Sequence, residues 1–174
     1  MHAMRALPVL LAASCATLTP LDQTLSSDGD PIEITSFRTE IVSANDPDAP
    51  DAVIVRLSLE NDPICNAADD ERAYIVSLLL PDPAAVTLGS PIDLSQADGP
   101  VEPDLLVSCF CPAPEEDDAA EWAGTVTFTE LSDTTASLAL DARFEGITTI
   151  GESEVVEIEG DFDVPDDRAS SCNW

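Results

Sequence analysis

The fold is decided by residues 125–164, which read TVTFTELSDTTASLALDARFEGITTIGESEVVEIEGDFDV. Apolar and polar residues alternate along three runs of this stretch, and successive side chains of a β-strand point to opposite faces of a sheet. Each run therefore predicts a strand with one buried face and one wet face. Ser132-Asp133 and residues 146–152 supply the reversals between the runs. The three strands are expected to pair as an antiparallel meander.

Shorter apolar runs, separated by Pro, Asp and Gly, extend the same pattern toward the N-terminus. Tyr74–Leu80 is apolar on nearly both sides, as a central strand covered on both faces would be. The remaining predicted strands are residues 32–42, with a bulge near Phe37, and residues 53–60, 84–88 and 105–110. Short helical turns are expected only in residues 67–73 and 115–122. The whole pattern predicts an all-β fold, either an antiparallel β-sandwich or a small barrel.

The chain is strongly acidic: its 174 residues include 35 Asp and Glu against 6 Arg and no Lys, for a formal net charge of −29. This charge excludes nucleic acid as a partner, because binding it needs a basic surface that displaces counterions. A hydrophobic content of 44% favours a folded domain over disorder. The length fits a single domain, and the negative surface favours solubility.

The first residues follow the order of an export signal, with Arg5 before an apolar run at residues 6–13 and small residues after it. That run is too short to span a bilayer as a helix. Leu11–Cys15, which reads LAASC, resembles the lipobox of bacterial lipoproteins, although Leu is usual where Ala12 stands. A rival cut after Ala16 by ordinary signal peptidase would instead give a secreted protein, either periplasmic or extracellular.

The resemblance implies that residues 1–14 are a signal peptide and that Cys15 receives a lipid and becomes the mature N-terminus. It also implies a membrane anchor in the cell envelope, at the outer membrane, because Ala16 stands where Asp retains such proteins at the inner membrane. Residues 15–31 are polar and predict a flexible tether, and residues 32–174 a single disulfide-bonded β-domain. The C-terminal part also resembles β-rich envelope lipoproteins that end in G-x-F-x-x-P…Cys. The residues that carry this pattern are Gly160, Phe162, Pro165 and Cys172.

Five Cys are an odd number for an exported chain, and the assignment of Cys15 to the lipid or to the signal leaves four. These four predict two disulfides in an oxidising compartment. A direct bridge between Cys109 and Cys111 would strain the backbone. We therefore expect Cys65 and Cys172 each to bond one member of that pair, with the choice of partner open.

No enzymatic activity is predicted. Removal of the signal leaves no His or Lys to act as a base, and no Gly-rich phosphate loop is present. A hydrolase built from two carboxylates is the weakest of the functions considered. The sequence favours an anchored β-domain with an interaction or structural role, directed at a protein or carbohydrate partner.

The alternative is an exported binding module that uses acidic loops for calcium or for a cationic ligand. Its candidate ligands are Asp46, Asp48, Asp51, Asp69 and Asp70. Their spacing does not follow the EF-hand order, and Asp commonly marks turns through local hydrogen bonds to the backbone. No other cofactor is expected.

Overall fold

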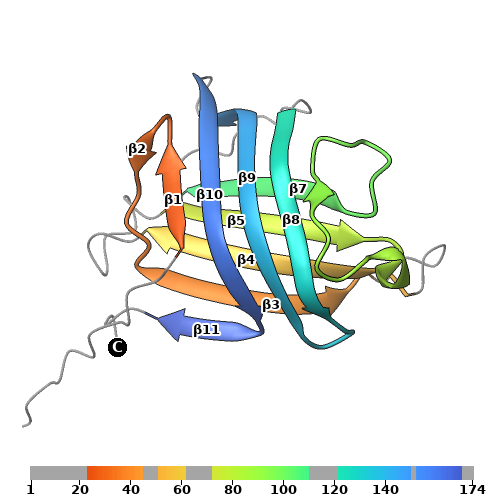
Figure 1. The fold of residues 1–174 in the computed structure, drawn as a ribbon. Helices are drawn as coiled ribbons and strands as arrows, with labels where there is room; N and C mark the ends of the chain where they lie inside the picture. The colour runs from red at the N-terminus through yellow and green to blue at the C-terminus, as the bar shows by residue number, and fades with distance from the viewer. Residues whose placement is uncertain (1–22, 45–50, 62–71, 110–120, 150–151, 170–174) are drawn as a thin grey trace, which may run out of the picture.

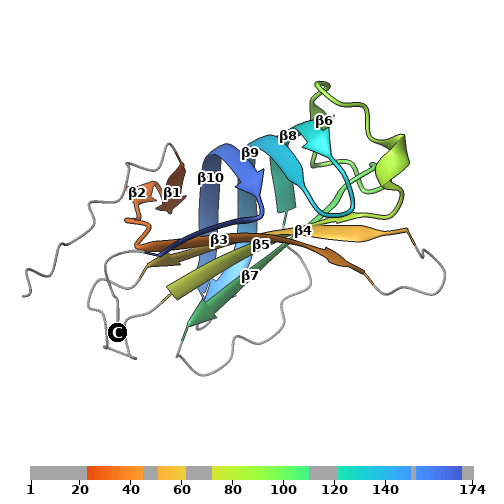
Figure 2. The same cartoon turned by 90° about the horizontal axis from the view of Figure 1, so that it is seen from below.

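The computed structural model of the chain describes residues 23–44, 51–61, 72–109, 121–149 and 152–169. In these segments eleven strands form two antiparallel sheets, which lie one over the other in Figure 2. Sheet A has the order β2-β1-β10-β9-β8-β6, and sheet B the order β11-β3-β4-β5-β7. The strands of the two sheets cross steeply (Figure 1), which is the orthogonal type of sheet packing. The predicted all-β class is confirmed, as a sandwich.

The strands have the following bounds. Sheet A contains β1 (Thr24–Ser27), β2 (Asp30–Pro31), β6 (Ile92–Asp93), β8 (Glu121–Leu131), β9 (Ala136–Thr149) and β10 (Glu152–Val164). Sheet B contains β3 (Ser36–Ser43), β4 (Val53–Asn61), β5 (Arg72–Leu80), β7 (Glu102–Cys109) and β11 (Asp166–Ala169). One 3-10 helix, η1, covers Pro83–Ala85. Within the described segments no helix has the length and apolar character needed to cross a membrane.

Strands β8, β9 and β10 form the predicted meander, and their apolar faces are buried as the alternation requires. The corresponding faces of β4 and β5 cover them from sheet B, so the two inner faces share one core. Phe37 of β3 and Phe162 of β10 meet across the sheets, with ring centroids 5.7 Å apart. Burial of one large apolar side chain stabilises the fold by about 1.5–3 kcal/mol. The core therefore depends on residues that period-2 patterning identifies.

Strand β5 lies between β4 and β7, so the prediction of a central strand over Tyr74–Leu80 is confirmed. Tyr74, Val76 and Leu78 are fully buried toward the core. Ile75 and Leu79 point outward and are only partly exposed.

The chain passes from sheet A to sheet B between β10 and β11, at the cis Val164–Pro165 peptide. The hydroxyl of Thr39, a β3 residue that is 2% exposed, lies at this corner. It donates a hydrogen bond to the carbonyl oxygen of Asp163 and accepts one from the backbone N–H of Asp166, both 2.7 Å long. One buried hydroxyl thus joins the end of β10 and the start of β11 to β3.

The predicted tether over residues 15–31 is wrong for its C-terminal part. Thr24–Ser27 pairs with β10 in sheet A, and Leu25 is buried in the core. The folded domain therefore includes residues from Gln23 onward instead of beginning at residue 32. The strand escaped prediction because it contributes a single apolar side chain, which makes no alternation. Residues 15–22 lie outside the described segments.

Four other predictions differ from the structure. Strand β3 begins at Ser36, and its partners on β4 follow without a register shift, so the bulge expected near Phe37 is absent from it. Residues 84–88 form no strand, because Asp82 accepts a hydrogen bond from the N–H of Ala84 and Pro83 starts η1. Strand β9 runs through Gly146, the residue at which the β9–β10 pairing shifts register. In the predicted helical turns, Arg72–Ala73 and Glu121–Trp122 are strand residues, and all the other positions lie outside the described segments.

Candidate binding surface on sheet A

A row of exposed polar residues crosses five strands on the outer face of sheet A. Each residue is the register partner of the next, from β1 through β10, β9 and β8 to β6. We call it the acidic row, and its members are Thr24, Glu159, Asp141, Thr125 and Asp93. Neighbouring strands lie about 4.8 Å apart, so the row extends for about 19 Å.

The centre of the acidic row places two like charges side by side. Glu159 of β10 and Asp141 of β9 are direct cross-strand partners, and both are exposed. Carboxylates in this arrangement destabilise a sheet. The pairing therefore makes no contribution to folding that would explain it.

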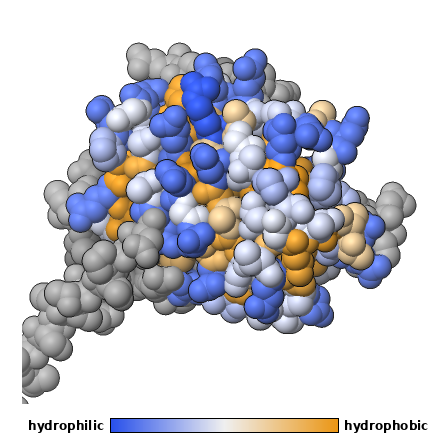
Figure 3. Space-filling view, in the orientation of Figure 1, coloured by the Kyte–Doolittle hydropathy of each residue, from blue (hydrophilic) through white to orange (hydrophobic). Residues whose placement is uncertain are grey.

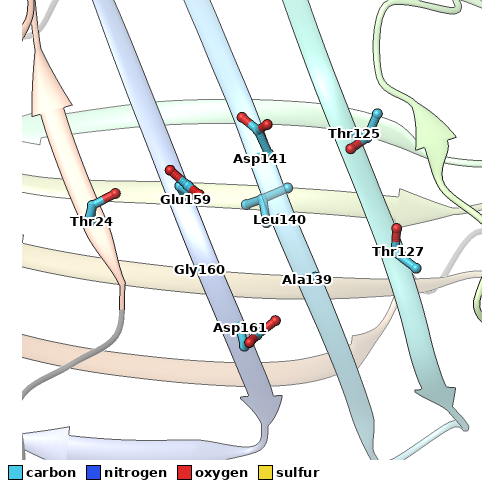
Figure 4. Close-up of a pocket in the computed structure, with 9 residues that line it drawn as sticks. All are labelled: Thr24, Thr125, Thr127, Ala139, Leu140, Asp141, Glu159, Gly160 and Asp161. Carbon is cyan, nitrogen blue, oxygen red and sulfur yellow. The ribbon is translucent and has the colours of Figure 1, made fainter.

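An open hollow of about 380 Å³ lies over this centre (Figure 4). Its lining consists of Thr24, Thr125, Thr127, Ala139, Leu140, Asp141, Glu159, Gly160 and Asp161. None of these described residues is basic, and Asp161 adds a third carboxylate. Ala139 stands between Asp161 and Thr127 in the neighbouring register line, where its short side chain leaves room.

A second hollow of about 430 Å³ adjoins the first and shares Thr24, Asp141 and Glu159 with it. Arg143 lines this second hollow. Its guanidinium is 2.8 Å from the carboxylate of Glu145 and 3.8 Å from that of Glu157. Exposed pairs of this kind contribute only about 0–1 kcal/mol to stability. The positive charge of Arg143 is thus shared with two acids at its own end of the surface.

At the β6 end of the acidic row, Asp93 is held as a carboxylate. Its Oδ1 accepts hydrogen bonds from the hydroxyl of Ser95, 2.7 Å away, and from the Ser95 N–H, 2.9 Å away. Gln96 donates a weaker one to Oδ2 at 3.5 Å. These bonds favour the ionised form and lower the pKa of Asp93. The row therefore keeps its negative charge at this end.

The outer face of sheet B has a different character. Arg38 and Arg56 both pair with Glu40, at 3.6 Å and 2.8 Å. Aliphatic side chains lie on the same face, and Leu106 is 52% exposed. The outer face of sheet A, seen in Figure 3, is mainly hydrophilic over its strands, with smaller apolar areas. The outer faces of the two sheets therefore differ in chemical character.

Of the calcium and cysteine candidates predicted from the sequence, the structure describes only two, Asp51 and Cys109. Asp51 is an exposed turn residue, and Cys109 is the last residue of β7. The remaining candidates, which lie outside the described segments, are Asp46, Asp48, Asp69, Asp70, Cys15, Cys65, Cys111 and Cys172. Within the described segments no three His, Cys, Asp or Glu side chains are grouped so that they could hold a metal ion.

The acidic row was missed at the sequence level, although the outward positions of Glu159, Asp141 and Thr125 follow from the alternation. Their alignment depends on two register shifts, at Glu154/Val155 in β10 and at Phe128/Glu130 in β8. No local sequence signal fixes such shifts, so strand faces were predictable and the row was not.

Comparison with known proteins returns no matching family model, no matching curated protein and no matching solved structure.

Proposed function

We propose that this chain is a non-enzymatic lipoprotein of the cell envelope whose anchored sandwich binds a basic protein segment along the acidic row. The observation that carries the proposal is the direct opposition of Glu159 and Asp141 in a hollow lined by no basic residue. Lys or Arg side chains of a partner would relieve that repulsion. The threonine hydroxyls of the row would accept hydrogen bonds from the same groups.

The dimensions and charge of the surface fit an extended peptide. A length of about 19 Å corresponds to about six residues of extended chain, at about 3.3 Å per residue. The groups are exposed, so their attraction for a cation is screened as ionic strength rises. Complementary charge of this kind acts mainly on specificity and association rate.

A titration with a six-residue lysine peptide tests the proposal, measured calorimetrically at low salt and again in about 0.5 M salt, where screening is strong. The test variant is the double substitution Asp141→Asn/Glu159→Gln. The control variant, Glu102→Gln/Asp104→Asn on exposed positions of β7, changes the net charge equally. We expect the test variant to weaken binding about tenfold, equivalent to about 1.4 kcal/mol, and the control about threefold or less. Equal losses would show that only net charge matters and would refute a site on sheet A.

The order of strands in sheet B supports two disulfides and hence export. Arg72 at the start of β5 is the register partner of Cys109 at the end of β7, and Cys65 precedes Arg72 by seven residues. Strand β11 ends at Ala169, at the same end of the sheet, and Cys172 follows three residues later. The four cysteines other than Cys15 are thus close in sequence to strand termini at one end of sheet B (Figure 1). An oxidising compartment is where such cysteines form disulfides.

The intact mass of the native protein tests the anchor and the disulfides together. We expect the mass to show loss of residues 1–14, a lipid on Cys15 and the absence of four thiol hydrogens. The variant Cys15→Ser should lose the lipid mass and leave the membrane fraction. Recovery of the full-length chain from the cytosol, with every thiol free, would contradict the proposal.

A further inference from the structure

The N-terminal part of sheet A is attached to the body by few apolar contacts. We call residues 23–31 the strap, which comprises Gln23, β1, the turn at Asp28–Gly29 and β2. Its one large side chain in the core is Leu25, 3% exposed. Strand β1 pairs with β10 at four positions only, whereas β9 pairs with β10 along the whole of both strands (Figure 1). Segments with few buried apolar contacts open at a lower free energy than the whole fold.

The start of the strap fits into a notch in β10 that exists because residue 160 is glycine. A Cβ atom at Gly160 would lie 2.7 Å from Cγ and 2.9 Å from Cα of Gln23, closer than atoms approach in proteins. The Gln23 amide nitrogen donates a hydrogen bond to the carbonyl oxygen of Asp161. Its Oε1 is buried and has no hydrogen-bond partner among the described atoms. A buried acceptor without a partner favours release of the strap, because water would satisfy it.

The other end of the strap is held by polar contacts. The N–H of Asp28 donates to the carbonyl oxygen of Val155 at 2.8 Å, and the Asp28 carboxylate accepts from the Val155 N–H at 3.0 Å. The hydroxyl of Ser27 donates to the carboxylate of Glu154. Water replaces contacts of this kind at a small net cost, because folding only exchanges one set of hydrogen bonds for another. The strap is therefore held to β10 mainly by contacts that water can replace.

We propose that the strap detaches from β10 while the rest of the sandwich stays folded. Release would add nine residues to the connection at the N-terminal end, or about 30 Å when fully extended. A domain tied to a membrane through its N-terminus could then follow a bound partner outward without unfolding. This role for the longer connection rests on the proposed lipid anchor. The detachment itself requires neither lipid nor ligand.

Amide hydrogen exchange of the mature protein, with its disulfides intact, tests the proposal under native conditions. Amides whose hydrogen bonds join β1 to β10 should exchange at least tenfold faster than those at the centre of β9, whereas β10 amides that bond to β9 should stay protected. The variant Gly160→Ala should speed exchange of the strap at least tenfold further. It should lower the melting temperature less than the control below, the remaining fall coming from the strain of a Cβ atom at φ +156° in β10. A matched control is Gly124→Ala, because a Cβ there would lie 2.0 Å from the carbonyl oxygen of Asp141 in the middle of sheet A. This control should lower the melting temperature and speed exchange throughout the sheet.

Three results would overturn the proposal. The first is equal exchange of β1 and β9 in the unaltered protein. The second is a fall in the melting temperature of Gly160→Ala like that of Gly124→Ala, which would make β1 part of the global unfolding unit. The third is a Gly160→Ala variant with unchanged exchange everywhere. Since the measurement needs no partner and no lipid, its outcome is independent of whether the acidic row binds peptides.

Discussion

Substitution of Thr39 by valine tests the corner where the chain crosses between the sheets. Valine keeps the shape of the side chain, so the core is not emptied, but it removes the hydroxyl that bonds Asp163 and Asp166. Each intramolecular hydrogen bond contributes about 1 kcal/mol net, so the loss of both should lower the free energy of unfolding by about 2 kcal/mol. For a domain of about 150 residues this corresponds to a fall of about 4–8 °C in melting temperature.

Urea unfolding followed by tryptophan fluorescence would measure the change for Thr39→Val, with a slope against urea that should stay constant. Thr125→Val is the control, because it makes the same chemical change at an exposed position of β8 and should shift stability by no more than about 0.5 kcal/mol. If both variants lose the same amount, or if Thr39→Val loses less than about 0.5 kcal/mol, the corner does not depend on this hydroxyl.

The remaining predictions concern the core, the loop after β6 and calcium. Phe144→Ala should cost about 3–5 kcal/mol, since the ring is fully buried. It should also red-shift the fluorescence of Trp122, whose ring stands edge-on to Phe144 at 4.9 Å; an unshifted spectrum would contradict that contact. Ser95→Ala should raise the pKa of Asp93 measured by NMR, because the hydrogen bond from the Ser95 hydroxyl disappears while the one from the backbone N–H of residue 95 remains. The pKa of Asp93 is lowered in the folded loop, so its contribution to stability is present above the unfolded pKa and disappears as pH falls through the folded value. Calcium titration should give no saturable heat, and a saturable site lost in Asp46→Ala or Asp69→Ala would establish the calcium alternative.

The fold class was predictable because alternation in β8, β9 and β10 records which side chains face the core. The sequence pattern says less about which strands are neighbours in the sheet. Strand β1 has only Leu25 as an apolar residue, so its pairing with β10 depends on tertiary contacts that no local pattern reveals. Residues 84–88 have the composition of a strand, yet the Asp82 cap and Pro83 favour a helical turn.

In the candidate site too, the sequence predicts which side chains face outward but not which of them lie opposite one another. The outward positions of Asp141 and Glu159 follow from period 2, and their opposition follows from register. Register depends on Gly146 and on the shift in β8, which move whole strands by one residue. The sequence also pointed to acids in loops, whereas the described structure concentrates paired acids on a sheet face.

Sheet A is bordered by β2 and β6, and each of these strands is only two residues long. A sheet grows by adding strands to its borders, and a border of two residues offers too few backbone groups to hold a newcomer. Mutual repulsion keeps such acidic molecules apart in dilute buffer, but this protection fades when salt screens the charge. The short borders protect sheet A by geometry and need no charge. While the strap is in place on β10, this protein should therefore resist strand-by-strand polymerisation through sheet A in brine as well as in fresh water.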